Sequence, residues 1–179
     1  GLQNLEETKL QDMLKENPLK FFFLAVVFAP IIEEGLYRTL VKPKPYELCL
    51  LLSVLIISFG FRFVPDDVVW WLKFLIGFLT LFIVFKVLEE LIPQAILQKT
   101  CDVLGRYTIP IIIVSSILFG FAHVSNYVDE FVVTWPIFIA IIPRIILGFM
   151  FCKVKIENDG IGWAMGLHAI NNGIVFLIG

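Results

Sequence analysis

Six long apolar segments follow one another along this chain, with short polar segments between them. They cover approximately residues 19–41, 46–64, 68–91, 108–127, 131–151 and 161–178. A helix needs about 20 mainly apolar residues to cross the hydrocarbon core of a bilayer. Each segment is about that long, and none alternates polar and apolar residues as a barrel strand does. The sequence therefore predicts an all-α, polytopic membrane protein with about six transmembrane helices.

The composition agrees with this prediction. Of the 179 residues, 59% are hydrophobic and 17% charged, whereas a soluble domain has roughly 45–50% apolar and about 25% charged residues. Residues 1–18 are an exception, because charged residues and leucines there follow helical spacing, and we expect an amphipathic interfacial helix. Residues 19–179 then form one transmembrane domain in contact with membrane lipid. The net charge of −2 gives no sign of a nucleic-acid partner, and nothing indicates the oligomeric state.

Basic residues are concentrated in the odd-numbered connections between the apolar segments. These connections contain Lys42, Lys44, Lys99, Arg106, Lys153 and Lys155, whereas the second and fourth contain Asp66, Asp67, Asp129 and Glu130. Short loops rich in Lys and Arg stay on the cytoplasmic side of a membrane. We therefore expect the odd-numbered loops to be cytoplasmic.

Two acidic residues, Glu33 and Glu34, lie far inside the first apolar segment. A charge at the centre of a spanning helix costs about 2.5 to 3.5 kcal/mol, so such a pair needs a reason. Arg38 follows Glu34 by four residues, which places both on one helical face as an ion pair. Glu33 has no such neighbour and is the better candidate for a general base. The alternative is that both acids belong to a structural ion-pair network.

The sequence has two histidines, and both lie inside apolar segments. His123 is in the fourth segment and His168 in the sixth, where Asn172 shares its helical face four residues later. A single buried histidine is more often a packing group than a catalyst. Two of them, together with an intramembrane acidic pair, favour a functional site.

Three motifs occur in a fixed order: Glu33 to Arg38 as EExxxR, Phe119 to His123 as FxxxH, and His168 to Asn172 as HxxxN. Together they resemble the CPBP family, the CAAX-protease and bacteriocin-processing intramembrane endopeptidases. The resemblance implies that Glu33 and His123 activate a water molecule, and that His168 and Asn172 line an oxyanion hole. Glu34 and Arg38 would support this geometry, with no metal or other cofactor.

The same resemblance implies a membrane-associated peptide or protein substrate. It also suggests the bacterial cytoplasmic membrane, with the active site opening toward the cytoplasm. It does not identify the substrate or say whether the substrate is prenylated.

The chain departs from the family pattern in two ways. Thr39 stands where many members have glycine. Glu33 and His123 are also farther apart than is common, by about one helical hairpin, which we expect to be residues 46–91. Glu89 and Glu90 form a second acidic pair nearer to His123, but Gln94 replaces the arginine of the motif and Pro93 precedes it. We therefore rank this pair second.

The depth of His123 is a further difficulty. At a rise of 1.5 Å per residue, Glu33 and His168 lie roughly 12 Å from the cytoplasmic end of their spans, whereas a straight fourth helix carries His123 toward the far leaflet. Either the boundaries of that helix are misplaced, or it tilts or breaks, with Pro110 as one candidate position.

Two other functions remain open at this stage. Glu33, His123 and His168 are the ligand types of a catalytic zinc site, although no HExxH motif supports one. The protein would otherwise be a non-enzymatic bacteriocin-immunity or scaffolding membrane protein. Arg144 in the fifth segment fits any of these, either reaching the loop near Cys152 or neutralising an acid.

Overall fold

The computed structural model describes residues 12, 14–65, 67–126 and 134–178, and every regular element within these ranges is helical. Five helical segments in the described part are long and apolar enough to cross a membrane. They are α4 (Pro45–Gly60) with the 3₁₀ turn Phe61–Phe63, α5 (Trp70–Leu91), α7 (Thr108–Ala122) with the turn Val124–Asn126, α8 (Trp135–Glu157) and α9 (Ile161–Ile178). They correspond to the second to sixth predicted spans. The all-α, polytopic prediction is confirmed.

The first predicted span consists of three consecutive helical pieces. They are α2 (Pro18–Phe22), the π-helix Phe23–Phe28 and α3 (Ala29–Tyr37). The span therefore ends at Tyr37, four residues earlier than the predicted end at Val41. In the π-helix the amide of Ala29 donates to the carbonyl of Leu24, five residues back. The helix that contains the acidic pair thus begins directly after a π turn.

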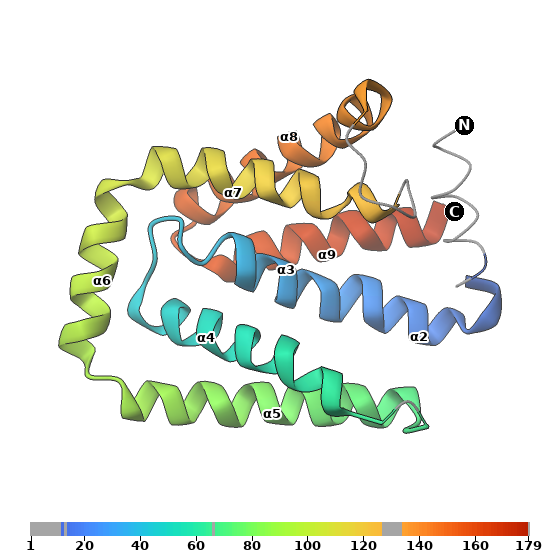
Figure 1. The fold of residues 1–179 in the computed structure, drawn as a ribbon, viewed down its shortest axis with the longest axis horizontal. Coiled ribbons are helices and arrows are strands. Elements are labelled where there is room, and N and C mark those ends of the chain that lie inside the picture. The colour runs from blue at the N-terminus through green and yellow to red at the C-terminus, as the bar shows by residue number, and fades with distance from the viewer. Residues whose placement is uncertain (1–11, 13, 66, 127–133, 179) are drawn as a thin grey trace.

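An additional helix, α6 (Gln94–Arg106), occupies the segment that the sequence predicted as a polar connector. It lies across one end of the molecule and joins α5 to α7 (Figure 1). Leu97 and Cys101 are buried against Leu48 and Cys49 of α4. The polar connector is therefore an amphipathic helix, and its polar residues belong to the outer face of that helix.

The long helices lie roughly side by side (Figure 1). α7 packs on α8, α8 on α9, and α9 on α3, while α4 packs between α3 and α5. Among the described residues of α5, only Gly77 is buried. The apolar side chains of this helix are at least partly exposed. Such a helix suits a position facing lipid.

The fifth predicted span is longer than expected. α8 continues to Glu157, so Lys153 and Lys155 lie on the helix and not in a loop. Lys155 is only 3% exposed, because Glu47 of α4 neutralises its charge. This correction leaves fewer basic loop residues to orient the chain.

Some predictions fall outside the described residues. These are most of the amphipathic segment 1–18, together with Asp66, Asp129 and Glu130. The cysteines Cys49, Cys101 and Cys152 are free and buried.

Candidate active site

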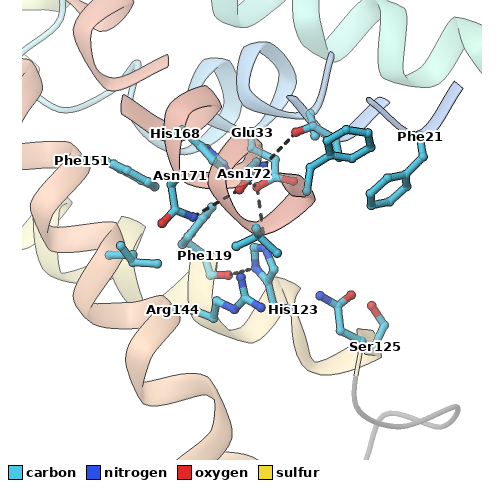
Figure 2. A pocket seen from close by; sticks show the side chains of 16 residues that line it. Phe21, Glu33, Phe119, His123, Ser125, Arg144, Phe151, His168, Asn171 and Asn172 are labelled. Carbon is cyan, nitrogen blue, oxygen red and sulfur yellow. Dashed lines mark hydrogen bonds and ion pairs between the residues drawn. The ribbon is translucent and has the colours of Figure 1, made fainter. Parts of the chain in front are cut away.

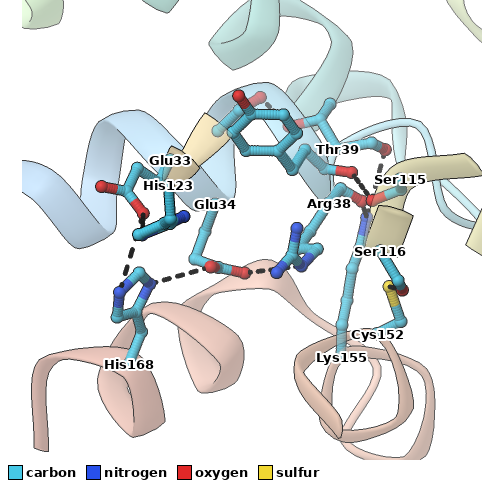
Figure 3. Close-up of polar contacts among 12 residues, drawn as sticks. Glu33, Glu34, Arg38, Thr39, Ser115, Ser116, His123, Cys152, Lys155 and His168 are labelled. Carbon is cyan, nitrogen blue, oxygen red and sulfur yellow. Dashed lines mark hydrogen bonds and ion pairs between the residues drawn. The ribbon is translucent and has the colours of Figure 1, made fainter. Parts of the chain in front are cut away.

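The central contact of the site joins α3 to α9. His168 Nδ1 lies 2.9 Å from Glu34 Oε1, and Arg38 Nε lies 3.2 Å from Glu34 Oε2 on the other side of the carboxylate (Figure 3). Glu34 and Arg38 are completely buried. The i,i+4 ion pair expected from the sequence is therefore present, and Glu34 also binds the histidine of a second helix.

The Arg38 side chain is held mainly by charge and by aromatic rings. In the described part of the chain, none of its guanidinium nitrogens has a hydrogen-bond partner, although its Nε is within ion-pair distance of Glu34. Its guanidinium carbon lies 4.2 Å from the ring centroid of Phe119 and 5.6 Å from that of Phe151. Cations over aromatic faces are stabilised by the ring quadrupole, more strongly when water is excluded.

Glu33 occupies a different environment from Glu34. Its side chain is 28% exposed, and its Oε2 atom lies 3.8 Å from both His123 Nε2 and His168 Nε2. These distances are too long for direct hydrogen bonds. They are short enough for one water or substrate oxygen to contact all three side chains. Of the two acids, Glu33 is thus the one that a small polar molecule can reach.

The hydrogen bonds of the two histidines define which ring nitrogens face Glu33. His123 Nδ1 lies 2.8 Å from the carbonyl oxygen of Phe119, and His168 Nδ1 lies beside the Glu34 carboxylate. A carbonyl or ionised carboxylate only accepts, so each Nδ1 carries the hydrogen. The Nε2 atoms are the ring nitrogens that face Glu33. At Nε2 a neutral ring accepts a proton, and a protonated ring donates one.

Asn172 is tied to the π-helix opposite it. Its Nδ2 donates to the carbonyl oxygen of Ala25 at 2.8 Å. In the π register the backbone partner of Ala25 would be Pro30, which has no amide hydrogen. The side chain of Asn172 supplies the missing donor, so the proline ahead of the acidic pair determines where this asparagine lies.

The four predicted catalytic residues line one cavity of about 530 Å³ (Figure 2). They are Glu33, His123, His168 and Asn172, from α3, the end of α7, and α9. Most of the other lining side chains are apolar, including Phe119 and Phe151. Such a cavity suits an apolar ligand positioned by a few polar groups.

His123 reaches this cavity without a break in its helix. α7 is continuous from Thr108 to Ala122, and His123 follows its last residue. Pro110 lies in the first turn of α7, where a missing amide hydrogen is tolerated. The suggested break near Pro110 was therefore wrong.

Four polar residues of the cavity were not assigned to the site from the sequence, namely Ser125, Asn126, Arg144 and Asn171. Arg144 of α8 lines the cavity beside His123 (Figure 2) and so does not extend to the loop after Cys152. Asn171 also lines it and donates to the side chain of Asn172 at 3.3 Å. The Asn171-Asn172 doublet in an apolar segment was a usable signal, whereas no local pattern indicated the direction of Arg144.

The second acidic pair lies elsewhere, on α5. Glu89 pairs with Lys86 at 2.7 Å, and among the described residues neither Glu89 nor Glu90 lines the cavity. Within the same residues, no group of three His, Cys, Asp or Glu side chains has the arrangement of a metal site.

The fold and the cavity define an integral membrane protein with an acid and histidine site among its helices. The chain belongs to the Rce1-like family of type II CAAX prenyl endopeptidases, whose family model matches residues 70–174, more than half of the chain. This is a family of proteases. The matched residues include His123, His168 and Asn172, whereas Glu33, Glu34 and Arg38 precede them. No curated protein and no solved structure matches the chain.

Proposed function

We propose that this protein is an intramembrane endopeptidase that hydrolyses a peptide bond of a membrane-associated CAAX-type peptide or protein. The observation that carries the proposal is the convergence of Glu33, His123 and His168 on one cavity, with both Nε2 atoms 3.8 Å from Glu33. The family match supports the substrate class. We further propose a bacterial cytoplasmic membrane, with the basic connections on the cytoplasmic side.

In the proposed reaction, water attacks the carbonyl carbon of the scissile bond. Glu33 accepts one proton of this water, and His123 holds the water through Nε2. A positioned base typically contributes about 10²- to 10⁴-fold to the rate. The proton then passes to the leaving nitrogen, the carbon–nitrogen bond breaks, and the products are a carboxylic acid and an amine.

The same proposal gives His168 and Asn172 the task of stabilising the oxyanion. A protonated His168 donates from Nε2, and the Glu34 carboxylate on Nδ1 balances its charge. Asn172 uses one Nδ2 hydrogen on Ala25 and has a second for the substrate. Removing one donor of an oxyanion hole costs about 10²- to 10³-fold in kcat.

Glu33→Gln tests the assignment of the base. We expect cleavage of a prenylated CAAX peptide, followed by mass spectrometry, to fall by about 10²-fold or more, because the amide cannot accept the proton. The matched control is Glu89→Gln, which alters the other acidic pair and should leave the rate unchanged. Full activity in Glu33→Gln would show that Glu33 is not the base. Loss of activity only in Glu89→Gln would assign the base to α5.

Chelation distinguishes this mechanism from a zinc-dependent one. We expect cleavage to continue after exhaustive treatment with a chelator, since the proposed reaction uses only Glu33 and His123 to activate water. A stoichiometric metal whose removal stops turnover would support the zinc-dependent version. Absence of cleavage in the wild type, together with lower thermal stability of Glu33→Ala, would instead favour a non-enzymatic role.

A further inference from the structure

A second buried polar cluster lies outside the cavity, at the carboxyl end of α3. Glu47 of α4 is completely buried and Lys155 of α8 is 3% exposed. Lys155 Nζ lies 2.7 Å from Glu47 Oε2. A buried ion pair gains little stability over apolar residues of similar size, because both charges must lose their water. The pair therefore contributes mainly through its remaining contacts.

Lys155 caps the end of α3. Its Nζ donates to the carbonyl oxygens of Arg38 at 2.9 Å and Thr39 at 3.1 Å (Figure 3). Carbonyls at a helix end have no partner within the helix, and a positive charge there is favourable. With Glu47 as the third acceptor, all three hydrogens of the ammonium group are used.

Glu47 caps the start of α9 in a complementary way. Its Oε1 accepts a hydrogen bond at 3.0 Å from the amide of Ile161, the first residue of α9. Its Oε2 accepts a second from the amide of Lys44 at 3.1 Å. Amides at a helix start have no partner within the helix, and a negative charge there is favourable. One ion pair thus holds the end of α3 and the start of α9 together.

These are the two helices that meet at the site. Arg38 follows Glu34 by four residues, and Ile161 precedes His168 by seven, which places the cluster roughly 6 Å and 10 Å away along the two helices. We propose that Glu47 and Lys155 are positioning residues that fix Glu33 on α3 relative to His168 on α9. The inference rests on the proposed peptidase function. It predicts that losing the pair affects turnover more than substrate binding.

The test uses the double variant Glu47→Met/Lys155→Met, which removes both buried charges and leaves no unpaired charge to prevent folding. We expect kcat to fall about tenfold to hundredfold, as displacement of a site by about 1 Å does. KM should stay within about twofold and the melting temperature close to that of the wild type. Lys155→Met alone should lose both stability and kcat, because it leaves Glu47 buried and unpaired.

Leu97→Ala is the control for stability, because Leu97 is buried between α6 and α4 and lies in neither cluster. It should lower the melting temperature and leave kcat near the wild-type value. A double variant with wild-type kcat would overturn the proposal. The proposal would also be overturned if kcat fell in proportion to the melting temperature in both Leu97→Ala and the double variant.

Hydrogen exchange gives a readout that does not require activity. In the double variant, amides of residues 36–41 should exchange faster than in the wild type, because α3 has lost its cap. If the wild type cleaves no peptide but these amides exchange faster in the double variant, the proposed function fails. The role of the pair in fixing α3 relative to α9 then still stands. Unchanged exchange would overturn the positioning role.

Discussion

Pro30 has an effect on the site that its position in the chain does not suggest. It lacks an amide hydrogen, so the Ala25 carbonyl of the π-helix is bonded by the Asn172 side chain of α9. Helix-breaking residues inside membranes are tolerated where neighbouring helices satisfy the freed backbone groups. Here the neighbour is a residue of the proposed oxyanion hole.

Pro30→Ala should therefore stabilise the helix and impair the site. The new amide can bond to Ala25, which releases Asn172 from its anchor. We expect an unchanged or higher melting temperature. We also expect kcat to fall about tenfold or more, approaching the loss that follows removal of an oxyanion donor. Pro110→Ala is the matched control, because Pro110 lies in the first turn of α7. An undiminished cleavage rate in Pro30→Ala would refute the anchoring role.

At the level of elements, α7 and α8 approach each other closely at Gly148. A Cβ atom there would lie 3.0 Å from Ser116 Cα and 3.1 Å from Ser116 Cβ. The first of these atoms is backbone and cannot rotate away. The position of α7, which leads to His123, thus depends on the absence of a side chain on α8.

Gly148→Ala should separate these helices slightly. We expect a loss of about 1 to 3 kcal/mol in stability, as for other overpacked contacts, and lower cleavage because His123 moves. Gly105→Ala on α6 is the control, since a Cβ there meets nothing within 4 Å, and it should be neutral or stabilising. Thermal unfolding in detergent measures both, and equal stability of the two variants would contradict the close-packing argument.

The turns before α4 and before α9 are joined by an exposed ion pair. Lys44 Nζ lies 2.8 Å from Asp159 Oδ2. The hydrogen bond from Lys44 and its charge lower the pKa of Asp159 below its ordinary value of 3.8. A lowered carboxyl pKa stabilises the folded state above the unfolded value and is lost as the pH falls through the folded value.

Asp159→Asn should thus remove a small, acid-sensitive part of the stability. The wild type should lose its advantage over the variant as the pH falls below about 4, where the carboxylate is protonated. Asn suits the site, because residue 159 has a φ of 52° and asparagine tolerates this region. Melting temperatures of both proteins across pH 3 to 7 check this, and a constant difference would argue against the pair.

For the whole molecule, the connections alternate between the two ends of the helices. The turn between α3 and α4, the helix α6 and the turn between α8 and α9 lie at one end, and the turn between α4 and α5 lies at the other (Figure 1). Six successive spans predict this alternation. The α3/α4 turn and α6 carry the basic residues Lys42, Lys44, Lys99 and Arg106, and basic connections favour the cytoplasm.

Asp159→Cys tests the orientation. The native cysteines are buried, so an impermeant thiol reagent should modify mainly the new residue. We expect labelling from the cytoplasmic side of inverted vesicles and little labelling of intact cells. The reverse result would place the basic end on the opposite side of the membrane.

Much of the architecture could be predicted from the sequence, because a bilayer requires long apolar helices and these can be read from consecutive residues. The contact of Glu34 with Arg38 is equally local, since it depends on a spacing of four residues. The expected insertion of residues 46–91 stays a prediction, although Glu47 of this segment pairs with Lys155, which contacts the end of α3.

Tertiary structure decided the rest, because the remaining contacts join residues far apart in the chain. His168 meets Glu34, Asn172 meets Ala25, and Lys155 becomes a buried helix cap and not a loop charge. Spacing cannot predict such pairs, since they depend on which helix faces pack together. The sequence by itself determined the membrane helices and the residue types of the site, while packing determined which of those residues share one cavity.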